Sequence, residues 1–113
     1  MSGGWRRQDE TAGAVFAALS DPTRRRVLRG LAAEGSATAT QLAASMTVTR
    51  QAVAKHLAAL ADAGLVQASR SGREVRYRIT AEPMTTAAGW MAEIGAEWDE
   101  RLDALRRHLL ERS

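Results

Sequence analysis

The sequence predicts a mainly helical domain that carries one small β-hairpin. Three observations support this fold class: five segments have apolar residues at helical spacing, one segment changes to strict alternation, and three of the helical segments begin with capping residues. The 113 residues suit a single domain, and the lack of cysteine excludes disulfides, thiolate metal sites and thiol redox switches. We expect residues 1–9 to form a flexible polar arm and residues 10–113 to form the domain.

Two helices are predicted in the first third of the chain. The first covers residues 10–19, and its apolar face consists of Val15, Phe16 and Leu19. The second begins after Asp21, which can accept hydrogen bonds from free backbone N–H groups, and Pro22 is tolerated at its first position. It is expected to end near Gly35.

Residues 38–63 predict two further helices joined by a tight turn. Thr38 and Gln41 form the capping-box pattern at the start of the first of them. Thr49 is placed to cap the second, whose inward face consists of Val53, Leu57 and Leu60. Two helices joined by a short turn, the second carrying basic and amide side chains at its start, are typical of a helix-turn-helix.

The apolar spacing then changes from helical to alternating over residues 65–80. Val75, Tyr77 and Ile79 alternate with polar residues, and Gly72 in the connection can adopt the positive φ that a tight hairpin needs. The sequence therefore predicts a two-stranded β-wing beside the helix-turn-helix, which completes a winged helix.

A long helix is predicted over residues 83–110. Its apolar residues recur every three or four positions along about 40 Å of helix. We call them the apolar stripe: Ala87, Met91, Ile94, Trp98, Leu102, Leu105 and Leu109. A chain of this size has little further core to cover the stripe, so we expect the same helix of a second copy to cover it, with the first helix, Trp5 and Trp90 packed alongside. The alternative is a helix folded back on its own domain.

The positive charge is concentrated in the middle of the chain, with net +4 over residues 50–80 and −3 over residues 81–113. A polyanion would therefore be attracted to the helix-turn-helix and the wing. Arg50 can donate two hydrogen bonds to guanine, and Gln51 can pair similarly with adenine. Lys55 and the capping threonines are suited to phosphates, and Arg73 at the hairpin tip is suited to a minor groove or the backbone.

The predicted DNA-contacting residues are Thr38, Thr40, Gln41, Thr49, Arg50, Gln51, Ala54, Lys55, His56, Arg70, Arg73 and Arg76. The predicted dimer interface consists of Val15, Phe16, Leu19, Met91, Ile94, Trp98, Leu102, Leu105 and Leu109. His56 is expected to be a packed or phosphate-contacting histidine and not a catalytic one.

Several short motifs resemble the ArsR/SmtB family of bacterial repressors. They are residues 18–24 (ALSDPTR), 41–43 (QLA), 53–60 (VAKHLAAL), 63–66 (AGLV), 72–73 (GR) and 77–79 (YRI). The resemblance covers residues 14–110 and implies a dimeric winged helix whose first and last helices form the dimer interface. Residues 98–105 are similar to a metal-independent branch of autorepressors. Ala54 stands where the family usually has serine, which removes a hydroxyl contact with DNA.

The metal sites implied by the resemblance are poorly matched. One would require thiolates at Ala43 and Ser45, and the other, across the paired last helices, is matched only by Glu97, His108 and Glu111. Zinc favours four ligands in which imidazole or thiolate dominates. We therefore expect no metal and no cofactor, with Glu97, His108 and Glu111 as the minor alternative.

The function predicted from these residues is that of a homodimeric repressor that binds double-stranded DNA at a near-palindromic operator. Catalysis is not expected, because the sequence has no Gly-rich phosphate loop, no G-x-S-x-G motif and no cysteine nucleophile. A cytoplasmic protein with no membrane segment is expected. Two alternatives stay open: a winged-helix module that binds an acidic protein, and a non-specific architectural DNA binder. An unidentified small-molecule inducer stays open as a further partner.

Overall fold

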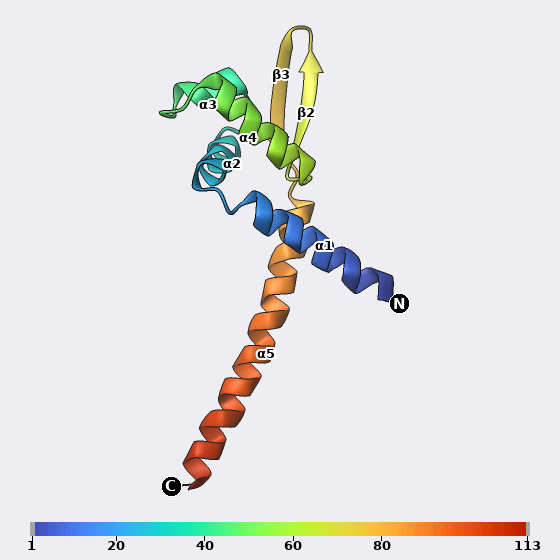
Figure 1. Cartoon of the computed structure of the whole chain (residues 1–113), viewed down its shortest axis with the longest axis vertical. Coiled ribbons are helices and arrows are strands. Elements are labelled where there is room, and N and C mark those ends of the chain that lie inside the picture. Colours follow the sequence, from blue (N-terminus) through green and yellow to red (C-terminus); the bar gives the residue numbers. More distant parts are fainter. Residues whose placement is uncertain (1, 113) are drawn as a thin grey trace.

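The chain folds into helices and short strands that alternate along the sequence (Figure 1). The computed structural model describes the backbone of residues 2–112 and the side chains of residues 7–111. The elements are α1 (Ser2–Ala18), α2 (Pro22–Glu34), β1 (Ser36–Thr38), α3 (Ala39–Ala44), α4 (Arg50–Asp62), β2 (Val66–Ser71), β3 (Glu74–Ile79) and α5 (Glu82–Arg112). The described residues thus form five helices and a small antiparallel wing, and the predicted fold class is confirmed.

The predicted starts of α2 and α4 are confirmed by side chains that bind free backbone N–H groups. At the start of α2, Asp21 Oδ1 accepts hydrogen bonds from the N–H groups of Thr23 and Arg24 at 2.8 and 3.1 Å. At the start of α4, Thr49 Oγ1 accepts a hydrogen bond from the N–H of Ala52 at 3.1 Å. Each cap satisfies donors that the helix itself leaves unpaired, so each start is fixed locally.

The strands form one antiparallel sheet in the order β1–β3–β2. β2 and β3 pair from Val66 opposite Ile79 to Ser71 opposite Glu74, which leaves Gly72 and the residue after it as the turn. Gly72 has a φ of +63°, and no non-glycine residue among those described has a positive φ. A positive φ at the first central residue alone is the pattern of a type II′ turn, whose twist suits a hairpin.

The short strand β1 was not predicted, so the expected two-stranded wing gains a third strand. β1 pairs with β3 from Ser36 opposite Arg78 to Thr38 opposite Arg76. Three residues are too few to show an alternating pattern, which is why the sequence did not reveal it. Thr38 is both the last residue of β1 and the N-cap of α3, so this pairing fixes the start of α3 against the wing.

The core lies between α1, α2, α3, α4, the base of the wing and the first turns of α5. Its most deeply buried large side chains are Val27, Leu31, Leu42, Val53, Leu57, Leu60 and Leu65. The predicted inward face of α4 is confirmed, and Val27, Leu28 and Leu31 form the buried face of α2. Because these apolar residues occupy one face of each helix, the opposite face is left for solvent or a partner.

Helices α1 and α5 cross near the start of α5, and the rest of α5 extends away from the other elements (Figure 1). α1 begins at Ser2 and not at residue 10, so the segment predicted as an arm is helical from Ser2 onwards. The rings of Phe16 and Trp90 pack where the helices cross, with centroids 5.7 Å apart. The predicted contact of Trp5 lies outside the described side chains.

The projecting part of α5 makes the molecule elongated. The radius of gyration is 19.2 Å and the principal extents are 69 × 36 × 19 Å. A compact domain of this length would have a radius of gyration of about 13 Å. None of the described helices has a stretch long and apolar enough to cross a membrane.

Candidate nucleic-acid interface

Helix α4 presents polar and basic side chains on its first two turns. Its apolar face is turned into the core, which leaves Arg50, Gln51 and Lys55 exposed. Ala54 follows Arg50 by one turn. Its small side chain allows another molecule to approach the helix backbone closely at this position. A helix of this kind can approach base edges in a major groove, where a guanidinium or an amide can form two hydrogen bonds with one base.

α4 forms one wall of a groove whose other walls are the start of α3 and the tip of the wing. The lining residues are Thr38, Ala39, Thr40, Gln41, Arg50, Ala54, Arg73, Glu74, Val75 and Tyr77. Six of them were predicted as DNA contacts: Thr38, Thr40, Gln41, Arg50, Ala54 and Arg73. Because apolar and polar residues alternate along β3, Val75 and Tyr77 were predicted to share one face of the wing. The structure shows that this face borders the groove together with α4. Ala39 and Glu74 gave no signal in the sequence.

Four other predicted contact residues are not part of the groove lining. Gln51 and Lys55 are exposed on the first turns of α4, and Thr49 caps that helix. Arg70 is exposed on β2 and lies opposite Val75, so it shares the face of the sheet that borders the groove. These residues surround the groove and do not form its floor.

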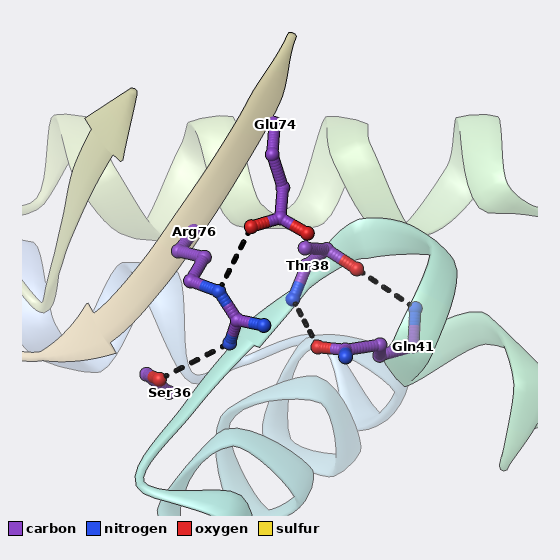
Figure 2. A network of polar contacts seen from close by, with 5 residues as sticks. All are labelled: Ser36, Thr38, Gln41, Glu74 and Arg76. Carbon is purple, nitrogen blue, oxygen red and sulfur yellow. Dashed lines mark hydrogen bonds and ion pairs between the residues drawn. The ribbon is translucent and has the colours of Figure 1, made fainter. Parts of the chain in front are cut away.

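The start of α3 is fixed by a reciprocal pair of hydrogen bonds (Figure 2). The N–H of Gln41 donates to Thr38 Oγ1 at 3.1 Å, and the N–H of Thr38 donates to Gln41 Oε1 at 2.9 Å. This is the predicted capping box. The Gln41 amide nitrogen and the Thr38 hydroxyl proton are engaged by no other described residue. They are donors of the kind that hold a phosphate.

Arg76 is not among the residues that line the groove, although the sequence grouped it with Arg73 and its partner Glu74 does line the groove. Its Nε donates to Glu74 Oε2 at 3.0 Å, and its Nη1 donates to Ser36 Oγ at 3.4 Å (Figure 2). Because both ionic partners are about half exposed, this pair contributes less than about 1 kcal/mol to stability. Its main effect is on position, since the guanidinium is held between β3 and β1.

His56 is half-buried on α4 and lies close enough to Asp21 for its charge to act on that carboxylate. The pKa of Asp21 is lowered from 3.8, chiefly by the hydrogen bond from the backbone N–H of Arg24. The N–H of Thr23 and the charges of His56 and Arg24 lower this pKa further, while partial burial opposes the shift. His56 therefore lies on the side of α4 that is near the start of α2, and it is not among the residues that line the groove.

The predicted dimer residues are exposed along α5 and mostly covered on α1. Between Met91 and Leu105 the large side chains of the apolar stripe are 37% to 55% exposed, and Leu109 is 59% exposed. On α1, Val15 is buried and Phe16 is 39% exposed, and Leu19, directly after this helix, is half-buried. α5 does not fold back on its own domain, so most of the stripe faces solvent in a single chain.

The candidate metal ligands Glu97, His108 and Glu111 are all exposed on α5. Glu97 and Glu111 are fourteen residues apart on one helix, about 21 Å along its axis. Zinc–ligand bonds are only about 2 Å long, so these three side chains cannot bind one ion within a single chain. Within the described part of the chain, no three carboxylate, histidine or cysteine side chains are grouped to hold a metal ion.

A capped helix, a tight turn, an exposed basic helix and a wing with arginine at its tip define a winged helix-turn-helix protein. In agreement with this class, residues 19–67 match the family model described as a helix-turn-helix domain. The chain belongs to the ArsR/SmtB family of transcriptional regulators. Its members are regulators and not enzymes, which agrees with the catalytic motifs missing from the sequence.

Three relatives illustrate the similarity. The solved structure of an ArsR-like transcriptional regulator from Rhodococcus sp. RHA1 is 44% identical with a TM-score of 0.75, over 86% of this chain and 91% of that one. The regulator CmtR of Mycobacterium tuberculosis strain H37Rv is 40% identical over 77 residues, which are 68% of this chain and 64% of CmtR. The chain thus spans less than two thirds of CmtR. The transcriptional repressor SdpR of Bacillus subtilis strain 168 is 31% identical over 77 residues, 68% of this chain and 84% of SdpR.

Proposed function

We propose that the protein is a homodimeric repressor that binds a near-palindromic operator without a sensory metal. One observation carries this proposal: a single groove is bordered by Gln41 at the start of α3, Arg50 at the start of α4 and Arg73 at the wing tip. These three side chains come from separate elements and converge on one surface. A surface of this shape and charge suits a DNA groove flanked by its phosphates.

The residues in and around the groove divide into two roles. Arg50 and Gln51 read base edges, because their side chains can form paired hydrogen bonds in the major groove. Thr38, Gln41 and Lys55 hold phosphates, which positions the protein without selecting a sequence. Arg73 reaches the neighbouring backbone or minor groove from the wing. Ala54 adds no hydrogen bond and allows close approach.

The apolar stripe supports a dimer in which α5 of each copy covers the other. A two-fold dimer would place two α4 helices about one turn of DNA apart, roughly 34 Å, and would therefore favour an operator with two similar half-sites. The alternative of a non-specific architectural binder predicts no such preference among sequences.

Metal independence is supported by the ligands that the chain offers. The relative CmtR is described as a cadmium metal-sensor. This chain has no cysteine at all, and Ala43 and Ser45 occupy the positions of the family's thiolate site. The remaining candidates, Glu97, His108 and Glu111, would offer zinc one imidazole and two carboxylates across two paired α5 helices, which is a poor ligand set. The protein therefore fits the autorepressor-like branch, which responds to a signal other than a metal.

The test is a titration of the full-length protein against the DNA upstream of its own gene, with scrambled DNA as competitor at about 150 mM salt. Specific binding is expected to survive EDTA and then added zinc. Arg50→Glu is expected to abolish it, and Arg107→Glu, which makes the same charge change on α5, is expected to retain it. If the protein shows no preference over scrambled DNA, the proposal of a specific operator at this site is wrong. If Arg50→Glu binds as tightly as the wild type, the groove is not the DNA-binding surface.

A further inference from the structure

A second concave region lies between α2, the end of α1, the base of the wing and the first turn of α5. We call it the hollow, and its apolar wall consists of Leu19, Leu28, Ala32, Ile79 and Met84. It shares no lining residue with the groove. Its volume is about 270 Å³. That is just below the range of ordinary small-ligand pockets, so it suits a small molecule and not a peptide or a long lipid chain.

Two arginines of α2 complete the lining of the hollow with the aliphatic parts of their side chains, so their guanidinium groups lie at its rim. Arg25 and Arg29 are one helical turn apart, so their side chains leave α2 on the same side. Arg25 Nη1 donates to the carbonyl oxygen of Leu19 at 2.6 Å, which fixes this guanidinium at the rim. The Arg29 guanidinium is engaged by no hydrogen bond or ion pair with the residues that the structure describes.

The charged residues around the hollow indicate which functional group a bound molecule should carry. Its seven lining residues, all within the described side chains, include two arginines and no acidic residue. An anionic group at the rim is therefore attracted by the two guanidinium groups and meets no carboxylate among the lining residues. A carboxylate suits the position best, because the planar guanidinium fork matches its two oxygens and forms strong charge-assisted hydrogen bonds.

We propose that the hollow binds a small apolar carboxylate of about the size of octanoate. Its hydrocarbon part packs against Leu28, Ile79 and Met84, where it loses contact with water. Its carboxylate accepts hydrogen bonds from Arg29 and from the free guanidinium nitrogens of Arg25. The site does not rest on the proposed function, since its occupancy is measured without DNA.

This site also accounts for part of the arginine cluster on α2. Arg26 lies in the same run but does not line the hollow, and its side chain is exposed. It therefore provides a matched control for the two arginines that do line it. Ala32 provides the complementary change, because it is exposed at the wall and a larger side chain there would fill the hollow.

The experiment is calorimetric titration of the full-length protein with sodium octanoate, and with 1-octanol as the uncharged probe of the same length. One octanoate is expected to bind per chain, and octanol at least about tenfold more weakly. Arg29→Gln, which removes the charge, is expected to weaken octanoate binding by at least about tenfold. Arg26→Gln is expected to leave it unchanged, and Ala32→Phe to abolish it while the helical circular dichroism is retained.

The proposal is overturned if octanoate does not bind at millimolar concentration, if octanol binds equally well, or if Arg26→Gln weakens binding as much as Arg29→Gln. It is also overturned if a second copy covers the hollow. That outcome would show as hydrogen-exchange protection of residues 28–32 that rises with protein concentration and is unaffected by octanoate.

Discussion

At the scale of single residues, Asp21 stabilises the start of α2 by both hydrogen bonding and charge. Its pKa in the folded protein lies below 3.8, so its stabilising effect is complete above that pH and is lost as pH falls through the lowered pKa. Asp21→Ala is expected to lower the melting temperature by about 4 °C near neutral pH. Thermal unfolding of both proteins by circular dichroism, from about pH 7 down to about pH 3, is expected to show this difference shrinking in the acid range.

Glu34 provides the control for this prediction because it is an exposed carboxylate at the other end of the same helix. A carboxylate there faces the negative end of the helix dipole, so Glu34→Ala is expected to leave the melting temperature unchanged or slightly raised. Equal melting temperatures for wild type and Asp21→Ala at neutral pH would show that the cap does not stabilise the fold.

Residue-scale features were predictable where the chemistry is local. Asp21, Thr38 and Thr49 bind N–H groups two or three residues away, so their sequence neighbours suffice to identify them as caps. Arg76 shows the opposite case. Its contact with Ser36 joins residues 40 positions apart and exists only because β1 pairs with β3 in one register. The sequence therefore grouped Arg76 with the wing-tip arginine, although its partners hold it elsewhere.

At the scale of elements, the wing has one face towards the groove and one face away from it. Arg73 lines the groove at the turn. Arg76 does not line it: this residue lies on the outer face of the sheet, opposite to Val75 and Tyr77, and is held by Ser36 and by Glu74, which itself lines the groove. Arg73→Ala is therefore expected to weaken operator binding by about tenfold, in the range of a single lost DNA contact. Arg76→Ala is expected to change it less than about threefold, since the Arg76 guanidinium does not line the groove and is already engaged by Glu74 and Ser36 in an exposed pair. Fluorescence anisotropy with labelled operator measures both.

The comparison of these two arginines also tests the groove as a whole. Both variants lose one positive charge from the same strand pair, so their long-range attraction to DNA falls equally. Similar losses for the two variants would mean that charge alone governs binding by the wing. A larger loss for Arg76→Ala would indicate that DNA contacts the outer face of the sheet.

Elements were predictable where an apolar pattern or a cap marks them. The helices α2, α4 and α5 show both an apolar face and a clear start, and their predicted extents are close to those observed. The first half of α1 has neither, since Gly3 and Gly4 disfavour helix and the regular apolar face begins only at Ala12. Its helical start at Ser2 was therefore missed. The groove and the hollow depend on how separate elements pack, which no local pattern contains.

At the scale of the whole molecule, the apolar stripe and the elongated shape have one physical explanation. A helix that projects beyond its own domain with half-exposed Leu, Ile, Met and Trp side chains leaves apolar surface in water. Complete burial of a fully exposed side chain of this kind is worth about 1.5–3 kcal/mol, and roughly half of that is still to be gained by each of these half-exposed side chains. A second copy that presents the same stripe can bury all of them at once, and two-fold symmetry makes one surface complementary to itself.

This explanation predicts that one charge in the stripe separates the dimer. Leu105 is 53% exposed near the middle of the projecting part, so Leu105→Glu would place two carboxylates in the interface. Its mass by light scattering is expected to fall from twice 12.2 kDa to 12.2 kDa. Operator affinity is expected to fall by about a hundredfold or more, because the two half-sites are then bound independently.

Ala96→Glu introduces the same charge on the opposite side of α5, where the side chain is also exposed. It is expected to retain both the dimer mass and operator binding. If Leu105→Glu stays dimeric, another surface joins the two copies. If it is monomeric but binds the operator as tightly as Ala96→Glu, one copy suffices for recognition. Because monomer mass and lost affinity are expected together only when α5 sets the spacing of the two α4 helices, the pair of measurements distinguishes the dimer interface from the DNA interface.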